Sequence, residues 1–522
     1  MQELKFEELT VEQKLGLVTN INMNWWEITP EWERFFLDQL KKRAVGSIWI
    51  QYNVVDAAKY IQYVREHADY PVLIITDAEA GIFDYKVGAH NVVGCTGSEE
   101  HAYAFGKVIG AAARKVGYDV VCNPILDASN LGSARSIGSN KYEVARLAKA
   151  VARGMHDAGI LTVAKHYPSP LRDKFEDTHM MEGHCDQTKE QLLESSLYPY
   201  AELMKDNLLD GIMTGHEKLP NIDPDHPTSL SKKVISIIRE MGFDGFAITD
   251  ALEMMGIKAK YGETDPVGLA IGAGNDIALP FTTDSEKNYN AMVDCYKRGL
   301  IDDDRLDEAV KRVLAAQHKA FMNIKNPEFT DKELETFNNI PKDAVFAQTD
   351  DGLLPSISRD GKHLFSVLIR NEFEVEENKV LEDTFTSTWH FPNKIKERLN
   401  ELFPNSEVVF IKEFPTGPQN RVVLHKSLEY DDTVFITFSE SMPYAGKECL
   451  TRRIESLFEA MQKTNRISTV MHFGNPFSLE NLPHIPRYIL GTRSEKSVNA
   501  CLDVLAGLYP AKGKLTFDVK LN

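Results

Sequence analysis

The chain has 522 residues, of which 43% are hydrophobic and 26% are charged. These are ordinary values for a globular protein, and they exclude a disordered or fibrous chain. Lys and Arg total 59 against 77 Asp and Glu, which gives a formal charge of -18. That balance argues against a nucleic-acid backbone as the main partner, because such binding needs a basic footprint. The length exceeds that of one ordinary domain, and we expect two.

The first residues and the cysteines indicate the cellular compartment, and the metal-ligand and glycine-rich motifs indicate whether a cofactor is bound. The first residues contain no apolar signal core, and no apolar run is long enough to span a membrane, so we expect a cytoplasmic location without membrane association. Six cysteines lie far apart without a CxxC pair, which is typical of reduced thiols. Neither a metal-ligand cluster nor a GxGxxG or Walker loop is present, so we expect no metal and no cofactor. The sequence carries no signature of an oligomeric state.

Eight short apolar runs alternate with amphipathic stretches up to about residue 325. The runs cover residues 15–21, 46–51, 71–77, 119–127, 160–167, 211–216, 246–250 and 275–280. Helical patterns between them include residues 56–68, 98–117, 141–159 and 231–242. Continuous apolar runs separated by helices are typical of buried parallel strands with crossover helices. The sequence therefore predicts an α/β fold with an N-terminal (β/α)8 TIM barrel over residues 1–325, although the first run is weak and is also compatible with a helix.

A polar stretch over residues 326–360 predicts a linker with a short helix, and a second α/β pattern follows over residues 361–522. Its expected strands are residues 363–371, 407–413, 432–439, 468–476, 487–492 and 514–519. Helical segments lie between them. The pattern predicts an open sheet of about six strands covered on both faces, which is a C-terminal three-layer α/β/α sandwich domain.

Reactive or strongly polar residues end several of the barrel runs. They are Asp77, Asp127, Lys165, His166, His216 and Asp250. In a parallel barrel all strand carboxyl ends lie on one face, where active sites are built. The alternative is that polar residues simply begin loops, but five such strand ends favour one shared pocket.

The densest polar segment is residues 165–184, on the long loop after the fifth run. Within it, Asp177-Thr178-His179 places a carboxylate two residues from an imidazole. In a turn, that spacing lets the carboxylate accept a hydrogen bond from one ring nitrogen, which leaves the other for proton transfer. The bare pattern is common in surface loops.

Asp250 follows a four-residue apolar run in the segment GFDGFAITDALEMMGI, residues 242–257. A carboxylate at the mouth of a barrel is suited to act as a nucleophile, a base or a metal ligand. An aspartate that simply caps the following helix is equally compatible with the spacing.

These segments resemble glycoside hydrolase family 3, and in particular its β-N-acetylglucosaminidase branch. FDGFAITDALEM is similar to the family's nucleophile segment, and KHYPSPLRDKFEDTH is similar to the branch's acid/base loop. Further similarities, in the same order along the chain, are PVLIITDAEAG, CNPILDASNLGSARSIGS, IMTGHEKLPNIDPDHPTSLSKKVI, HFGNPFSLENLPHIPRYI and GKLTFDV. The resemblance covers nearly the whole chain.

The resemblance implies a role for each matching residue. Asp250 is implied as the nucleophile, His179 as the acid/base and Asp177 as the residue that orients it. Most retaining glycosidases use two carboxylates, so a histidine acid/base departs from the general rule. The positions implied to hold sugar hydroxyls and the N-acetyl group are Asp77, Arg135, Lys165 and His166. For Lys165 and Arg135 the alternative is a structural ion pair with barrel carboxylates.

The chain also departs from the family pattern. Ser169-Pro170-Leu171-Arg172 replaces a shorter glycine-containing stretch, which predicts a stiffer loop. Ala78 and Ala80 replace a glutamine and a glycine, and Ala134 replaces an aspartate. These changes line the expected sugar subsite.

The resemblance implies a retaining exo-β-N-acetylglucosaminidase that uses an Asp nucleophile and an Asp-His pair on a small carbohydrate substrate. Three alternatives stay open. They are a β-N-acetylglucosaminide phosphorylase, a β-glucosidase of the same family with an acid such as Glu440, and a non-catalytic sugar-binding protein.

Overall fold

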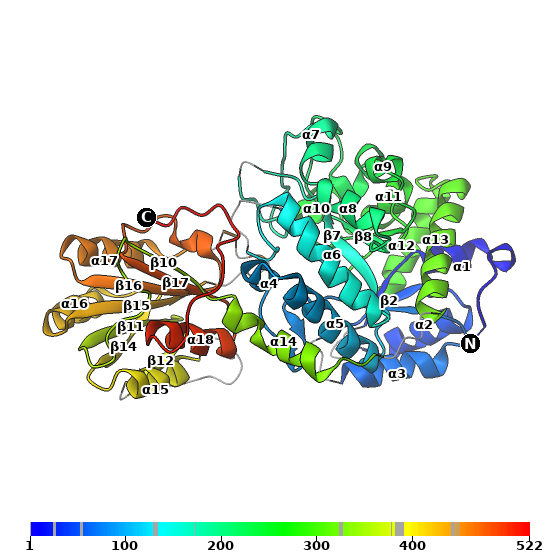
Figure 1. The fold of residues 1–522 in the computed structure, drawn as a ribbon. Helices are drawn as coiled ribbons and strands as arrows, with labels where there is room; N and C mark the ends of the chain where they lie inside the picture. The colour runs from blue at the N-terminus through cyan, green and yellow to red at the C-terminus, as the bar shows by residue number, and fades with distance from the viewer. Residues whose placement is uncertain are drawn as a thin grey trace. The chain divides into compact units, whose positions relative to one another are not determined.

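The computed structural model of the chain describes residues 2–23, 28–52, 56–128, 134–172, 174–322, 327–376, 378–381, 391–439, 444, 446, 447 and 449–522. The chain forms two compact units, in both of which helices surround the strands (Figure 1). The first comprises Met1–Lys86, Glu99–Ser129 and Ser139–Phe337, and the second comprises Val87–Ser98, Asn130–Gly138 and Asn338–Asn522. The expected domain limits at residues 325 and 361 stay predictions.

Within the described part of the first unit, seven parallel strands form one sheet. In sheet order they are β1 (Ile21–Asn22), β2 (Ser47–Trp49), β3 (Leu73–Thr76), β6 (Val120–Val121), β7 (Leu161–Tyr167), β8 (Gly211–Thr214) and β9 (Phe246–Thr249). Parallel bridges pair Ile277 with Ile248 in β9 and pair Ala278 with Thr19, just before β1. The last expected run therefore connects the two edge strands, and the predicted α/β barrel class is confirmed. The weak first run is divided, because its first three residues end α1 at Leu17 and its last residue, Ile21, begins β1.

The barrel strands are buried, as their continuous apolar runs predicted. Alternate residues of neighbouring strands share one hydrophobic cluster, because successive side chains of a strand point to opposite faces. Its members include Leu73, Ile75, Val120, Leu161, Val163, Met213, Phe246, Ile248 and Ile277. Gly245 precedes β9 at a point where a Cβ atom would lie 2.1 Å from the carbonyl oxygen of Asp210. Only glycine lets β9 begin this close to the residue before β8.

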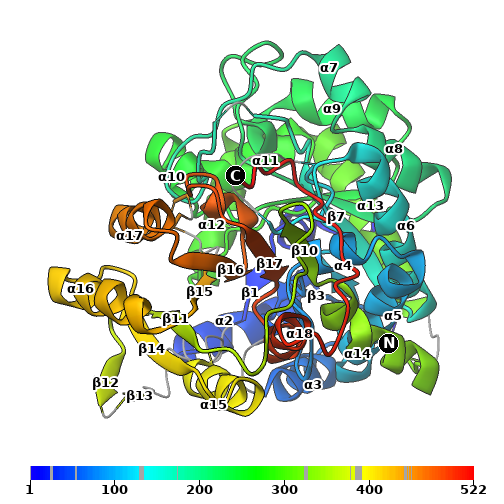
Figure 2. The same ribbon diagram turned by 60° about the vertical axis from the view of Figure 1, so that its left-hand side comes forward.

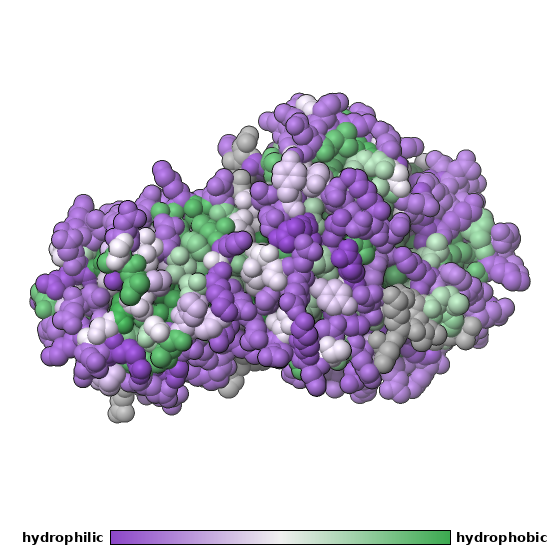
Figure 3. Space-filling view, in the orientation of Figure 1, coloured by the Kyte–Doolittle hydropathy of each residue, from purple (hydrophilic) through white to green (hydrophobic). Residues whose placement is uncertain are grey.

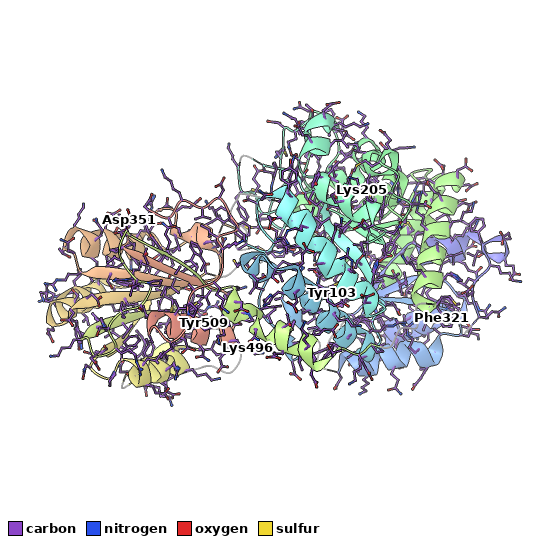
Figure 4. All side chains as sticks on the ribbon, in the orientation of Figure 1. Tyr103, Lys205, Phe321, Asp351, Lys496 and Tyr509 are labelled. Atoms are coloured by element: carbon purple, nitrogen blue, oxygen red, sulfur yellow. The ribbon has the colours of Figure 1, made fainter. Side chains whose placement is uncertain are left out.

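Helices precede the first strand and follow most of the others. They are α1 (Val11–Leu17), α2 (Pro30–Lys41), α3 (Ala57–His67), α5 (Glu99–Val116), α6 (Lys141–Asp157), α7 (Lys189–Glu194), α8 (Tyr198–Lys205), α9 (Lys232–Glu240), α10 (Met255–Tyr261), α11 (Asp265–Ala273), α12 (Ser285–Lys297) and α13 (Asp303–Met322). A short hairpin, β4 (Gly81–Ile82) and β5 (Tyr85–Lys86), follows β3, and α14 (Asp331–Asp343) follows α13. Helices α5 and α6 lie side by side in both ribbon views (Figures 1 and 2). Tyr103, labelled in Figure 4, lies on α5. Its hydroxyl donates a hydrogen bond to Oδ2 of Asp157 on α6 at 3.0 Å.

Three buried aspartates lie at the amino ends of the barrel strands: Asp119 before β6, Asp210 before β8 and Asp276 before the Ile277 bridge. Each accepts a backbone N–H from the neighbouring strand. The donors are Ile74 to Asp119 at 2.9 Å, Thr162 to Asp210 at 2.8 Å and Ala247 to Asp276 at 2.8 Å. Each also pairs with basic side chains. This end of a barrel is where side chains serve stability rather than catalysis.

The second unit has a six-stranded sheet in the residues that the structure describes. Its order is β10 (Phe346–Thr349), β17 (Arg487–Gly491), β16 (Ile467–Phe473), β15 (Asp432–Phe438), β11 (His363–Ile369) and β14 (Glu407–Lys412). Only β10 is antiparallel to its neighbour among these pairs. Two further strands, β12 (Glu374–Glu376) and β13 (Lys379–Leu381), form a hairpin.

Helices cover both faces of this sheet. They are α15 (Pro392–Leu402), α16 (Gly417–Lys426), α17 (Arg452–Lys463) and α18 (Glu495–Leu505), and the unit also contains α4 (Asn91–Thr96). One apolar cluster joins α15 and α18 to the sheet, and a second joins α16 and α17 to its other face. Figure 2 shows these pairs on opposite sides of the strands. The predicted three-layer arrangement is confirmed.

One expected strand of this unit is wrong. Residues 514–519 form no regular strand, and the sixth strand is β10, which lies within the residues expected to be a linker. The alternation that suggested a strand has another cause. Phe517 and Val519 pack against Phe477, while Leu515 contacts the α16–α17 cluster. The segment is extended and anchors its apolar side chains without pairing in the sheet.

Hydrophilic residues cover most of the face shown in Figure 3, with hydrophobic residues in scattered groups between them. Among the helices that the structure describes, none combines the length and the apolar composition needed to cross a bilayer.

Candidate active site

The reactive residues found at the strand ends lie at the carboxyl ends of the barrel strands. Asp77 directly follows β3, Asp250 directly follows β9, and His216 lies two residues beyond β8. Lys165 and His166 belong to the last three residues of β7. Because parallel strands end at the same face of the barrel, these side chains gather at one end of the first unit.

His166 lies between two carboxylates. Its Nδ1 is 2.9 Å from Oδ2 of Asp127, and its backbone N–H donates to Oδ1 of the same residue at 2.8 Å. Its Nε2 lies 3.9 Å from Oδ2 of Asp250. When Nδ1–H donates to Asp127, Nε2 is the ring atom that faces Asp250. One imidazole thus connects the ends of two strands.

The Asp250 carboxylate is held in its ionised form. Burial by itself would raise the pKa of Asp250, but the charge of His166 and the backbone N–H of Ala251 act against it, and the pKa lies below its usual range. That N–H donates to Oδ1 at 2.8 Å. Burial likewise opposes the charge of Asp127, yet His166 keeps the pKa of Asp127 well below its usual range. An ionised carboxylate is the form that a nucleophile requires.

Lys165 forms a second charged group with Asp77 and Glu79. Its Nζ lies 2.5 Å from Oδ1 of Asp77 and 2.6 Å from Oε1 of Glu79, and its side chain is only 2% exposed. This is the structural ion pair that the sequence left as the alternative for Lys165. The two carboxylates are partly exposed, and carboxylate oxygens accept hydrogen bonds from sugar hydroxyls. In this arrangement the lysine holds the two carboxylates close together.

Both charged groups act on one buried thiol. Cys122 directly follows β6, and burial is the main reason that the pKa of its thiol is raised well above the usual range. The charges of Asp77, Lys165 and Asp250 also act on it. Residues at the carboxyl ends of β3, β7 and β9 are therefore close enough to the end of β6 for their charges to act on the same thiol.

The Asp-Thr-His turn has the hydrogen bond that its spacing predicted. Nδ1 of His179 lies 2.7 Å from Oδ1 of Asp177, which also accepts the backbone N–H of His179 at 3.0 Å. Asp177 is buried, and the His179 side chain is 26% exposed. The bond to Asp177 orients the ring so that Nε2 is the atom directed away from the carboxylate.

This turn is attached to the helix that follows Asp250. The N–H of Met255 donates to the carbonyl oxygen of His179 at 3.0 Å, and the N–H of Gly256 donates to that of Thr178 at 3.1 Å. A Cβ atom on Gly256 would lie 2.8 Å from the Thr178 oxygen, so glycine permits the close approach. The candidate acid/base and the candidate nucleophile are therefore linked through the first turn of α10.

The altered loop supplies contacts of its own. Oγ of Ser169 donates to Oδ1 of Asp127 at 2.7 Å and lies 3.2 Å from the hydroxyl of Tyr200. Nη1 of Arg172 donates to the carbonyl oxygen of Glu176 at 2.7 Å. The serine in place of a glycine thus supports the same aspartate that orients His166.

Arg135 belongs to the second unit. It is half-buried in Asn130–Gly138, and its neighbour Ala134 packs against Phe477 and Phe517. The structure therefore assigns six of the seven predicted site residues to the barrel unit. Their catalytic and sugar-binding roles stay predictions, and the alternative acid Glu440 lies outside the described residues.

Three further residues contribute to the site, although the sequence predicted no role for them in the reaction. Asp127 and Glu79 carried a usable signal, because each lies near the end of an apolar run beside other polar residues. The contact of Ser169 depends on the path of the loop, which no local pattern reveals. Among the described residues, no cluster of His, Cys, Asp and Glu has the geometry to hold a metal ion.

A cavity of about 310 Å³ lies at the opposite end of the barrel strands, where Arg65, Arg114, Asp119 and Phe321 form part of its wall. Phe321 is near the end of α13 (Figure 4). Both arginines are paired with Asp119, at 2.5 and 2.6 Å. This cavity has none of the residues that the sequence singled out for catalysis.

Comparisons with known proteins agree with the geometry. A β-N-acetylglucosaminidase/β-glucosidase of Cellulomonas fimi is 26% identical over 294 residues, which are 52% of this chain and 52% of that protein. The β-hexosaminidase LpqI of Mycobacterium tuberculosis is 32% identical over 204 residues, which are 37% of this chain and 51% of that protein. The chain thus aligns with about half the length of these relatives.

Solved structures share the fold over almost the whole chain. A family 3 β-N-acetylglucosaminidase from Paenibacillus sp. superposes with a TM-score of 0.80 at 22% identity, covering 98% of this chain and 100% of that one. The β-glucoside phosphorylase BglX superposes with a TM-score of 0.79 at 22% identity, covering 98% and 94%. Residues 10–316, more than half of the chain, match the glycosyl hydrolase family 3 N terminal domain. The chain belongs to glycosyl hydrolase family 3.

Proposed function

We propose that this chain is a retaining exo-β-N-acetylglucosaminidase. The observation that carries the proposal is the junction at α10: Asp250, kept ionised beside His166, precedes the turn to which the backbone of His179 is hydrogen-bonded. The names of two relatives support this choice of sugar: the protein from Cellulomonas fimi is a β-N-acetylglucosaminidase/β-glucosidase, and that from Mycobacterium tuberculosis is a β-hexosaminidase.

The first half-reaction forms a glycosyl-enzyme ester. Oδ2 of Asp250 attacks the anomeric carbon, the bond from that carbon to the leaving oxygen breaks, and Nε2 of His179 gives its proton to that oxygen. Oδ1 keeps the hydrogen bond from Ala251 N–H, so among the described residues Oδ2 is the oxygen without a hydrogen bond. Asp177 accepts from Nδ1 throughout and stabilises the charged imidazole before transfer.

The second half-reaction returns the enzyme to its starting state. Neutral His179 takes a proton from water, the water oxygen attacks the anomeric carbon, and the carboxylate of Asp250 leaves. Two displacements at one carbon retain its configuration. Lys165 and its two carboxylate partners, together with His166, provide the charged donors and acceptors for the sugar hydroxyls.

Phosphorolysis is a second candidate, favoured by the imidazole at the acid/base position. A neutral imidazole does not repel an approaching phosphate dianion, as a carboxylate would. In that case phosphate replaces water in the second half-reaction, and the product is a sugar 1-phosphate. The fold is shared with a β-glucoside phosphorylase, which agrees with either chemistry.

Kinetics on 4-nitrophenyl glycosides test the proposal. The chain should release 4-nitrophenol from the β-N-acetylglucosaminide faster than from the β-glucoside, and Asp250→Ala should abolish release. Azide should restore turnover of Asp250→Ala and give the α-glycosyl azide, because azide then occupies the position of the nucleophile. His184→Ala is the matched control, because His184 lies on the same loop with a side chain 49% exposed and has no assigned role in the reaction.

Four outcomes separate the alternatives. Sugar 1-phosphate formed on adding inorganic phosphate assigns phosphorolysis. Faster turnover of the glucoside, unchanged by His179→Ala, assigns the β-glucosidase reaction. Calorimetric sugar binding without turnover assigns a binding protein. Full activity of Asp250→Ala on the N-acetylglucosaminide contradicts the mechanism itself.

A further inference from the structure

Three methionines around the Asp-Thr-His turn are exposed. Met180, Met181 and Met255 have 45%, 48% and 41% of their surface accessible, although methionine is among the residue types that are most often buried. A single exposed apolar side chain is ordinary, whereas a group beside a candidate active site indicates a binding surface. We name these three residues the methionine rim.

The members of the rim are held together by the backbone of the turn. The N–H groups of Met180 and Met181 both donate to the carbonyl oxygen of Asp177, at 2.9 and 3.0 Å. The N–H of Met255 donates to the carbonyl oxygen of His179 at 3.0 Å, and a Cβ atom on Gly256 would lie 2.8 Å from the carbonyl oxygen of Met181. The rim therefore borders His179 from its own loop and from the first residue of α10.

The position of His179 determines which part of the substrate lies beside the methionine rim. A general acid must come within hydrogen-bond reach of the oxygen that it protonates. With the sugar on the side of Asp250, the leaving oxygen lies beside His179, and the remainder of the leaving group extends past the residues that flank it. The methionine rim supplies those flanking side chains.

The chemistry of the rim suits an apolar leaving group. A thioether has no donor and accepts hydrogen bonds only weakly, so it offers little to the hydroxyls of a second sugar. Methionine is flexible and polarisable, and it packs well against alkyl chains and aromatic rings of differing shape. We infer that the leaving-group subsite of this enzyme takes an apolar aglycone, alkyl or aromatic, in preference to a saccharide; this inference rests on the proposed glycosidase function.

Methyl and octyl β-N-acetylglucosaminides provide the test, because their leaving alcohols have similar acidity and differ in apolar area. The unmodified enzyme should show a kcat/KM about tenfold or more higher for the octyl glycoside, since burial of each methylene is favourable. In the triple variant Met180→Gln, Met181→Gln, Met255→Gln the octyl-to-methyl ratio should fall towards one. Met322→Gln is the matched control, because Met322 is 63% exposed at the end of α13.

The controls separate this inference from the proposed function. Circular dichroism melting shows whether the triple variant folds, and each single variant is measured if it does not. The inference is supported if the octyl-to-methyl ratio of kcat/KM falls in the triple variant while its turnover of the 4-nitrophenyl substrate is preserved. An octyl-to-methyl ratio near one in the unmodified enzyme, or a ratio that the substitutions do not change, refutes the inference about the leaving group but leaves the proposed function standing. Absence of turnover on the 4-nitrophenyl substrate as well refutes the proposed function.

Discussion

Asp210 stands before β8 at the amino ends of the barrel strands, and its replacement by asparagine should destabilise the first unit without changing the chemistry. Its side chain is 2% exposed. Oδ2 lies 2.6 Å from Nε2 of His156 and accepts the N–H of Thr162 at 2.8 Å, while Oδ1 pairs with Nζ of Lys319. Asparagine keeps the shape and an acceptor for Thr162 but removes the charge.

The expected loss in the free energy of unfolding follows from the ionisation of Asp210. Burial by itself would raise the pKa of Asp210, but the hydrogen bond and charge of His156 together with Lys319 lower it to about 2. An aspartate in the unfolded chain titrates near 3.9, so the difference of about two units contributes ~2.5 kcal/mol to the free energy of unfolding. Because the folded-state pKa is the lower one, this stability is present above about pH 4 and is lost as the pH falls towards 2.

Denaturant unfolding at pH 7, 5, 4 and 3, followed by tryptophan fluorescence, measures the effect. Four of the five tryptophans belong to the first unit. The free energy of unfolding should differ between the chain and Asp210→Asn by ~2.5 kcal/mol at pH 7 and 5, and by about half of that at pH 3. Asp244→Asn is the control, because the Asp244 side chain is 99% exposed and such charges contribute little.

Two results would refute this reasoning. One is a difference at pH 7 no larger than that of Asp244→Asn. The other is a difference that stays constant down to pH 3, because it would mean that the charge of Asp210 is not what stabilises the fold. Turnover per folded molecule should be unchanged in Asp210→Asn, since the carboxyl ends of the strands carry the candidate site.

Four further predictions concern the barrel. Asp127→Asn should lower kcat about 10²-fold with the fold intact, because His166 loses the carboxylate that orients it; an unchanged kcat contradicts this role. Lys165→Met should raise KM and lower the melting temperature, since two carboxylates lose their shared cation. A pH profile of kcat/KM should show no loss from protonation of Asp250 between pH 7 and 5, because its pKa is lowered; an acidic limb centred above pH 5 would contradict it. Asp276→Asn should cost about 3–5 kcal/mol in denaturant unfolding, because it breaks a fully buried group of paired charges.

The strands were predictable because a buried strand consists largely of apolar residues, and such runs are visible in the sequence. Runs such as 71–77 and 160–167 are largely apolar without a polar residue at every second position, as strands covered on both faces require, and β3 and β7 lie within them. The same reasoning misplaced one strand. Residues 514–519 alternate like a strand but pack without pairing, whereas β10 is short, partly exposed and set in a polar stretch. Pairing at a sheet edge depends on the neighbour, which the segment's own composition does not describe.

The Asp177–His179 hydrogen bond was predictable because only Thr178 separates its partners, so one turn decides it. The partners of His166 and Lys165 are 39 and 88 residues away, and their meeting depends on how the strand ends converge. By itself, therefore, the sequence determined the alternation of strands and helices in the barrel, the family and the residues able to do chemistry. Only the tertiary structure decided that Lys165 positions Asp77 and Glu79, that Asp127 and Ser169 support His166, and that His179 is attached to the helix after Asp250. The physical reason is distance: composition acts over neighbouring residues, whereas a hydrogen bond near 3 Å between distant segments exists only once the barrel has brought them together.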